Sequence, residues 1–134
     1  MKIEFATEND LNEISRLDEH ISRAELASLI PMKRVIVARD NNELCAWLRY
    51  GLFWDNIPFM NMIFVLEDYQ GKGLGKRLVE FWEAEVKSLG FHKIMTSTLS
   101  NEQAQHFYRK LGYKDCGSLL LPGEALEILF LKEL

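Results

Sequence analysis

Three glycines separated by single residues lie at positions 71, 73 and 75, within the stretch YQGKGLGKRLVEF. The apolar run PFMNMIFVL precedes them, and apolar residues at helical spacing follow them. Glycine tolerates positive φ and lets another group approach the backbone closely, so a dense cluster indicates unusual dihedrals or a bound ligand. A loop between a strand and a helix presents unpaired N–H groups at the positive end of the helix dipole. The stretch therefore predicts a phosphate-binding loop.

The spacing of these glycines fits neither of the two common nucleotide-binding motifs. A GxGxxG loop would need glycine at the position of Lys76. A Walker A loop would need glycine in place of Gln70 and Ser or Thr in place of Arg77. What remains is Q-x-x-G-x-G, from Gln70 to Gly75, in which successive N–H groups can face a pyrophosphate. A purely structural turn is the alternative, although one glycine normally suffices for a turn.

Length and composition predict one cytoplasmic domain covering residues 1–134. A chain of 134 residues can bury about two thirds of its unfolded surface in one core. No apolar run approaches the ~20 residues of a membrane span, and the opening MKIEFATEND has no signal sequence. A net charge of −4 argues against a nucleic-acid partner. Cys45 and Cys116 lack CxxC spacing, so we expect two reduced, buried thiols and no metal site.

Short alternating elements predict an α/β (α+β) fold. Strands are expected at 2–6, 35–39, 43–53, 58–66, 92–98, 113–120 and 126–132. Helices are expected at 8–20 and 23–30, behind the glycines as far as residue 89, and before Gly112. Three residue pairs have the spacing of a capping box and predict helix starts: Thr7 with Asp10, Ser22 with Glu25, and Ser100 with Gln103. The tetrapeptide DNNE and the pair Pro122 and Gly123 predict hairpin turns.

Two segments resemble the GCN5-related N-acetyltransferases, the GNAT family. In that family an apolar strand precedes Gln or Arg and then x-x-Gly-x-Gly or Ala, and residues 63–75 read IFVLEDYQGKGLG. Residues 101–113, NEQAQHFYRKLGY, are similar to the family segment N-x-x-A-x-x-F-Y-x-K-x-G-F/Y. Glu67 departs from the pattern, since the family often has proline there. The resemblance implies a GNAT-like domain with a twisted, mixed, largely antiparallel sheet and helices on both faces.

The resemblance also implies an activity and a set of binding residues. The activity is direct transfer of an acetyl group from acetyl-CoA to a primary amine of a small molecule or peptide, through a ternary complex. Tyr108 would act as general acid toward the departing thiolate, and Asn101 would bind the pantetheine arm. A core aromatic and a simple helix cap are the alternative readings of these two residues. The expected cofactor-binding residues are Ile63, Phe64, Val65, Gln70, Gly71, Lys72, Gly73, Leu74, Gly75, Lys76, Asn101 and Tyr108.

The sequence leaves the general base and the acceptor amine open. The stretch FMNM at the start of the central strand contains no acid. The candidate bases are Asp55 ahead of that strand, and Glu19, His20 or Glu25 where the first two helices meet, although each could be a solvated surface group. Aromatic residues between positions 47 and 59 hint at an acceptor with an apolar body. A homodimer is also left open.

Two other function classes are alternatives. A catalytically silent acyl-CoA sensor would keep the glycine loop but lack a working acid, so Tyr108 counts against it. A protein-interaction domain without a cofactor would not need the glycine loop.

Overall fold

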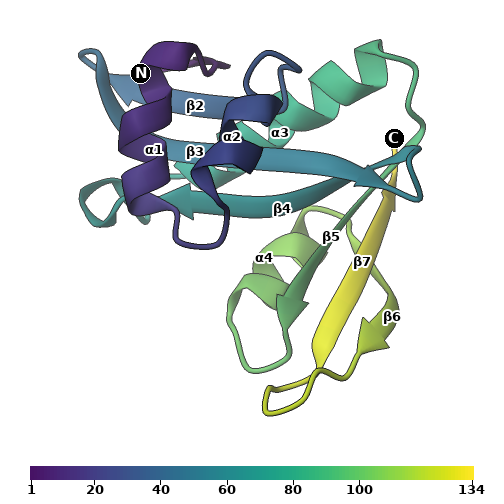
Figure 1. Cartoon of the computed structure of the whole chain (residues 1–134). Coiled ribbons are helices and arrows are strands. Elements are labelled where there is room, and N and C mark those ends of the chain that lie inside the picture. Colours follow the sequence, from purple (N-terminus) through teal and green to yellow (C-terminus); the bar gives the residue numbers. More distant parts are fainter. The chain divides into compact units, whose positions relative to one another are not determined.

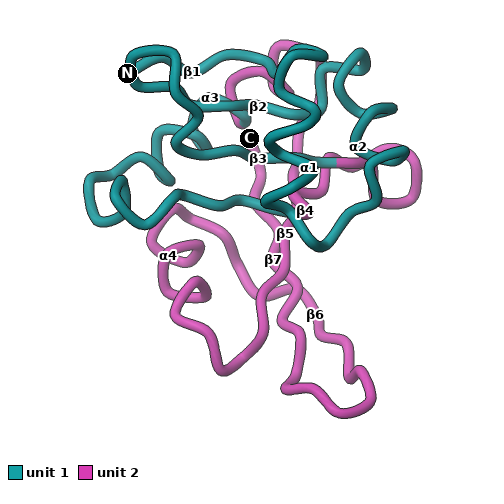
Figure 2. Tube along the Cα trace, turned by 60° about the vertical axis from the view of Figure 1, so that its left-hand side comes forward, with its two compact units in different colours: residues 1–50, 62–82 teal, residues 51–61, 83–134 magenta.

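The computed structural model describes residues 1–134 and divides them into two compact units (Figure 2). Unit 1 comprises residues 1–50 and 62–82, and unit 2 comprises residues 51–61 and 83–134. In chain order the elements are β1 (Lys2–Phe5), the 3-10 helix η1 (Glu8–Asp10), α1 (Leu11–Leu17), α2 (Arg23–Leu29), β2 (Val35–Asp40), β3 (Glu43–Phe53), β4 (Ile57–Val65), the 3-10 helix η2 (Glu67–Tyr69), α3 (Leu74–Ser88), β5 (Lys93–Leu99), α4 (Ala104–Lys110), β6 (Lys114–Leu119) and β7 (Glu127–Glu133).

Antiparallel pairing organises the strands of unit 1. β1 pairs with β2 and β2 pairs with β3, with a bulge between Ala38 and Arg39. Asn41 and Asn42 join β2 to β3 with φ of 52° and 68°, so the hairpin predicted at DNNE is confirmed. The second half of β4 lies beside β3. The N–H of Leu66, directly after β4, donates to the carbonyl of Cys45 in β3 at 2.9 Å.

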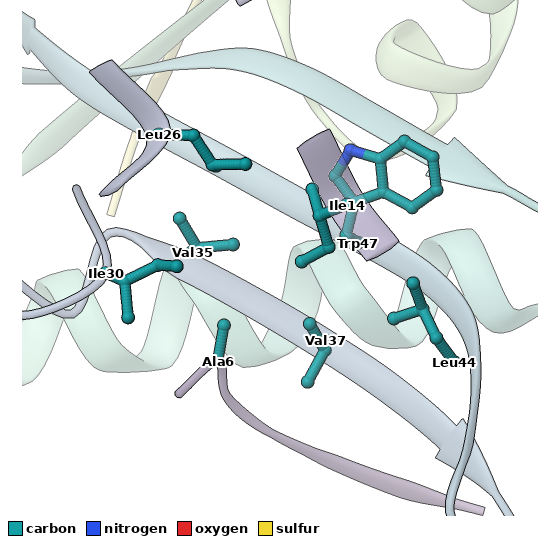
Figure 3. Packing of buried hydrophobic residues seen from close by; sticks show 8 residues of the cluster. All are labelled: Ala6, Ile14, Leu26, Ile30, Val35, Val37, Leu44 and Trp47. Carbon is teal, nitrogen blue, oxygen red and sulfur yellow. The ribbon is translucent and has the colours of Figure 1, made fainter. Parts of the chain in front are cut away.

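Helices cover both faces of the unit 1 sheet (Figure 1). α1 and α2 lie on one face, where a buried cluster joins them to β2 and β3 (Figure 3). Its members are Ala6, Ile14, Leu26, Ile30, Val35, Val37, Leu44 and Trp47. α3 lies on the other face, where the Trp82 ring is 5.8 Å from Tyr50 and the Phe81 ring is 5.8 Å from Phe5. The apolar stripe predicted behind the glycines therefore forms the buried face of α3, except for Leu89, which follows the helix and is exposed.

A buried ion pair fixes the end of α1 to β3. The Asp18 carboxylate accepts hydrogen bonds from Arg49 Nε at 2.8 Å, Trp47 Nε1 at 3.1 Å and the His20 N–H at 3.1 Å. Burial by itself raises the pKa of Asp18, but these donors, led by Arg49, outweigh it and hold that pKa below its usual range. A terminal nitrogen of Arg49 adds a fourth hydrogen bond at 3.3 Å, so the acceptor capacity of this carboxylate is used within the protein.

Unit 2 holds the end of the β3–β4 hairpin and the C-terminal strands. β4 and β5 are parallel, with Phe59 opposite Met95 and Met60 opposite Thr96. β5 pairs with β7, and β7 pairs with β6, both antiparallel. The strand order is β1-β2-β3-β4-β5-β7-β6. The prediction of a mixed, largely antiparallel sheet is confirmed, and no helix is both long and apolar enough to cross a membrane.

The structure corrects three local predictions. The helix expected at 8–20 is shorter, because η1 precedes α1 and Asp18 turns toward β3. Ser100 does not cap α4, because Gln105 donates to the Ser100 carbonyl at 2.7 Å and the helix begins later, after Gln103. Both cysteines are free as expected, but Cys116 is exposed and only Cys45 is buried.

The Asp18 pair predicts a specific loss of stability. Asp18→Asn leaves Arg49 as an unpaired buried charge, so we expect a loss of about 3–5 kcal/mol in the free energy of unfolding, measured in urea at pH 7. Because the folded pKa of Asp18 lies below the unfolded value of about 3.9, this stabilisation is complete above that value. It is lost as the pH falls through the lowered folded pKa, and the difference between variant and parent should then shrink.

Asp115→Asn is the matched control. Asp115 pairs with Arg109 at 2.9 Å, but 52% of its side chain is exposed. Because solvent screens an exposed pair, we expect this substitution to leave the free energy of unfolding at pH 7 nearly unchanged. Equal losses for the two variants would show that the buried pair does not anchor α1.

Candidate functional site

The glycine loop leads from η2 into α3 within unit 1. Gly71 and Gly73 have φ of 75° and 81°, a region that residues with a side chain rarely adopt. The first hydrogen bond back into the loop runs from the Arg77 N–H to the Gly73 carbonyl at 3.2 Å. The N–H groups of residues 71–76 have no acceptor within the unit. Six free donors at the positive end of a 15-residue helix are suited to binding a pyrophosphate.

Gln70 shapes the loop and is not one of these free donors. Its N–H donates to the Glu67 carbonyl at 3.2 Å, and its side-chain amide donates to the Val65 carbonyl at 2.8 Å. The side chain of Lys72 lies over the Tyr69 ring at 5.9 Å. The run of free donors therefore begins at Gly71, one residue later than the sequence predicted.

The end of β4 presents an open edge within unit 1. The N–H of Leu66 faces β3, and alternate residues of a strand face opposite edges, so the backbone of Phe64 also faces β3. The backbone groups of Ile63 and Val65 face the other edge, where unit 1 has no strand. Gln70 occupies the Val65 carbonyl, and the pairing of β4 with β5 ends at Met60, so the Ile63 N–H and carbonyl and the Val65 N–H have no strand partner. The side chain of Phe64 is 46% exposed, and its contact with the cofactor stays a prediction.

Tyr108 lies on α4 in unit 2 and is only 5% exposed. Its ring packs against Tyr113 at 5.7 Å and Phe130 at 5.8 Å. The helix ends in a Schellman motif at Gly112, in which the Tyr113 N–H donates to the Tyr108 carbonyl at 3.0 Å. Burial raises the pKa of Tyr108 to about 12, and a side-chain hydrogen bond with Thr96 lowers it only in part. The hydroxyl is therefore fully protonated at neutral pH.

This pKa changes the chemistry that Tyr108 can perform. A phenol of pKa about 12 is a weaker acid than a thiol of pKa about 8.5. Complete transfer of its proton to a thiolate with the pKa that thiols have in water would therefore be unfavourable. A hydrogen bond donated to the developing negative charge carries no such penalty and is strong in a buried site. The side chain is thus better suited to donating a hydrogen bond than to losing its proton.

Asn101 and Asp55, two further predicted site residues, are exposed. Asn101 lies in a turn three residues before α4, not at the start of the helix. Asp55 and Trp54 form the β3–β4 turn with φ of 62° and 53°. Asp55 belongs to unit 2, whereas the open edge at Ile63 belongs to unit 1.

Glu19 and Glu25 flank the connection from α1 to α2, and neither side chain is buried. His20 uses its backbone N–H to bind Asp18. No group of three or more His, Cys, Asp or Glu side chains is placed to hold a metal ion.

The sequence reasoning missed Asp18 and its partners. Arg49 gave the available signal, because it is a charged residue within the otherwise apolar run LCAWLRYGLF. Such a residue in a central strand needs a buried partner. The pattern does not say which acid supplies it, since Asp18 lies 31 positions away in the chain.

Comparison with known proteins identifies the family. Residues 4–113 match the sequence profile of the Acetyltransferase (GNAT) family. The chain belongs to this family. The resemblance inferred from the glycine loop and from residues 101–113 is therefore confirmed, and the chain is an acetyltransferase.

Solved structures of GNAT proteins share the fold along nearly the whole chain. An aminoglycoside 6'-acetyltransferase type Ii is 25% identical with a TM-score of 0.81, covering 99% of this chain and 97% of that one. An aminoglycoside 6'-N-acetyltransferase complexed with coenzyme A is 22% identical with a TM-score of 0.82, covering 99% and 97%. The ribosomal-protein-S18-alanine N-acetyltransferase from Escherichia coli is 21% identical with a TM-score of 0.79, covering 98% and 92%.

The loop geometry predicts the effect of a bulky residue at Gly73. An added Cβ meets no protein atom within 4 Å, so Gly73→Val should fold, with a loss of about 1–2 kcal/mol from the positive φ. The valine side chain would fill the space in front of the free N–H groups. We expect titration calorimetry to show at least a 100-fold loss of acetyl-CoA affinity, as several hydrogen bonds to charged oxygens are lost.

Gly123→Val is the matched control, because Gly123 has φ of 77° and equally open surroundings in the β6–β7 turn. It should lose similar stability and retain acetyl-CoA binding. Unchanged affinity in the Gly73 variant would remove the loop from the binding site.

Proposed function

We propose that this GNAT acetyltransferase transfers the acetyl group of acetyl-CoA to a primary amine of a small molecule or peptide, by direct transfer in a ternary complex. The row of free N–H donors from Gly71 to Lys76 carries the proposal. These N–H groups supply the hydrogen-bond donors that a pyrophosphate needs. The match to the GNAT family covers residues of both units. We further propose that residues 1–134 act as a single acetyltransferase domain.

The chain supplies binding groups for each part of acetyl-CoA. The N–H groups of residues 71–76 bind the pyrophosphate, with the ammonium groups of Lys72 and Lys76 adding charge. The free backbone groups of Ile63 and Val65 bind the amides of the pantetheine arm and orient the thioester. Asn101 offers a further side-chain donor and acceptor for the same arm.

The transfer forms a nitrogen–carbon bond and breaks the carbon–sulfur bond. The attacking amine must be neutral, and it releases one proton as the amide forms. Tyr108 donates a hydrogen bond to the sulfur and stabilises the negative charge that develops there. Glu19 or Glu25 accepts the amine proton, directly or through water. The departing thiolate finally takes a proton from solvent.

The acceptor belongs to one of two broad classes. Related folds act on aminoglycosides and on the alanine of a ribosomal protein, so this architecture serves both small amines and peptides. The net charge of −4 favours a cationic acceptor over an anionic one.

A panel of primary amines tests the activity. The panel combines aminoglycosides, polyamines, aromatic amines and short peptides, with free-thiol release from acetyl-CoA as the measurement. Amine-dependent thiol release is the expected result. Binding of acetyl-CoA by calorimetry without release on any amine would favour the silent sensor. Absence of binding would favour a domain without a cofactor.

Tyr108→Phe tests the role of the hydroxyl. The ring remains, so the core should stay packed, while the hydrogen bond to the sulfur is lost. We expect kcat to fall about 10²- to 10³-fold, as for removal of one oxyanion donor, with acetyl-CoA affinity within about threefold. Because the pKa of Tyr108 is about 12, its ionisation should leave no alkaline limb in the rate profile below about pH 11.

Tyr113→Phe serves as the control for a buried tyrosine. Its hydroxyl donates to Glu83 Oε2 at 2.8 Å, a contact within unit 2 that the proposed chemistry does not use. We expect a stability loss of about 1 kcal/mol and an unchanged kcat. A kcat for Tyr108→Phe within about threefold of the parent would remove Tyr108 from the mechanism, provided that chemistry limits turnover.

A further inference from the structure

Phe64 is the exposed aromatic side chain of unit 1. The large hydrophobic residues of this unit that remain substantially exposed are Met1, Leu17, Met32 and Phe64. Met1 is terminal, Leu17 ends α1 and Met32 lies in the turn after α2, whereas Phe64 lies within a strand. An aromatic side chain that keeps 46% of its surface exposed inside a strand adds little to the core. It is available to contact another molecule.

The position of Phe64 in β4 places it beside the atoms proposed to hold the thioester. Its backbone faces β3, while the free backbone groups of its neighbour Ile63 face the open edge. Its side chain lies on the α1 and α2 face, where it contacts Trp47. α3, which carries the glycine loop at its start, covers the other face. An amine that approaches the thioester from the face opposite α3 therefore meets the Phe64 ring.

Buried contacts hold this ring in place. The ring centroids of Phe64 and Trp47 are 5.2 Å apart with an interplanar angle of 31°. Trp47 is only 2% exposed, and its indole N–H donates to Asp18. Arg49 binds the same carboxylate through Nε and a terminal guanidinium nitrogen, at 2.8 and 3.3 Å. The orientation of the indole, and with it the surface on which Phe64 rests, is set by the buried ion pair.

We propose that Phe64 determines acceptor specificity by packing against the apolar body of the amine, and that Asp18 positions it through Trp47. The inference rests on the proposed function, because it assigns the amine side of the same site. Phe64 touches the acceptor. Asp18 and Trp47 act only through Phe64 and are positioning residues.

Comparison of two acceptors tests the role of Phe64. The substrates are the best apolar and the best hydrophilic amine of the panel, for example 2-phenylethylamine and ethanolamine, which have similar basicity. Phe64→Leu should lower kcat/KM about tenfold for the apolar amine and less than about twofold for the hydrophilic one. KM for acetyl-CoA should stay within about twofold.

Phe81→Leu is the matched control. Phe81 lies on α3 against Phe5, on the opposite face of the same sheet. It should leave the ratio of the two kcat/KM values unchanged, whatever stability it loses.

A double-mutant cycle tests the positioning role. Trp47→Phe keeps a ring against Phe64 but removes the indole N–H that binds Asp18. It should lower the ratio of kcat/KM for the apolar amine to kcat/KM for the hydrophilic amine about threefold to fivefold. In the double variant this ratio should be no lower than in Phe64→Leu alone. Additive effects would overturn the positioning role. If Trp47→Phe does not fold, Phe64→Trp and Phe64→Ala replace it, and the ratio should follow the size of the side chain.

The outcomes separate this inference from the proposed function. Absence of acetylation by the parent protein on every amine would overturn the proposed function, and this inference with it. Acetylation by the parent with an unchanged ratio in Phe64→Leu would overturn this inference alone.

Discussion

The free N–H groups of residues 71–76 are the constraint on which the proposed site depends. An ordinary helix would satisfy some of its first N–H groups with a capping side chain such as Ser or Asp. The residue before α3 is Gly73, which has no side chain, and its positive φ turns the chain so that the donors stay available. Gln70 fixes the entry to the loop by binding the Val65 carbonyl. No protein group in the loop accepts hydrogen bonds from these donors. A ligand with several anionic oxygens can therefore accept from several of them at once.

Burial gives the two polar residues at the centre of the argument opposite roles. Asp18 is buried among donors, so it stays ionised with a lowered pKa and has no capacity left for a substrate proton. Tyr108 is buried among aromatic rings, so it stays neutral with a raised pKa. The first therefore serves the architecture of unit 1, and the second provides a donor whose charge state does not change with pH in the physiological range.

The sequence was informative where a local rule decides the conformation. The Asn41 and Asn42 turn, the Thr7 capping box and the Schellman ending at Gly112 each depend on a few adjacent residues, and the family motifs lie in such segments. The same rules failed after Ser100, where Gln105 competes for the carbonyl groups that precede the helix. Asp18 and Trp47 could not be paired in advance, because their contact depends on how α1 crosses β3. The exposed side chain of Phe64 likewise depends on the register of β4, which an unbroken apolar run does not reveal.

The exposure of Glu19 and Glu25 also bears on which amines the site can use. Neither side chain is buried, so we expect the neutral fraction of the amine in solution to limit the rate of attack. At pH 7.5 about a third of an α-amino group with a pKa near 7.8 is neutral, against roughly 0.1% of a lysine-like amine with a pKa near 10.4. The greater nucleophilicity of the more basic amine offsets only part of this difference. For the proposed site, which would recognise its acceptor through the Phe64 ring and has only exposed candidate bases, we therefore expect a preference for apolar amines of low pKa, such as the N-terminus of a peptide.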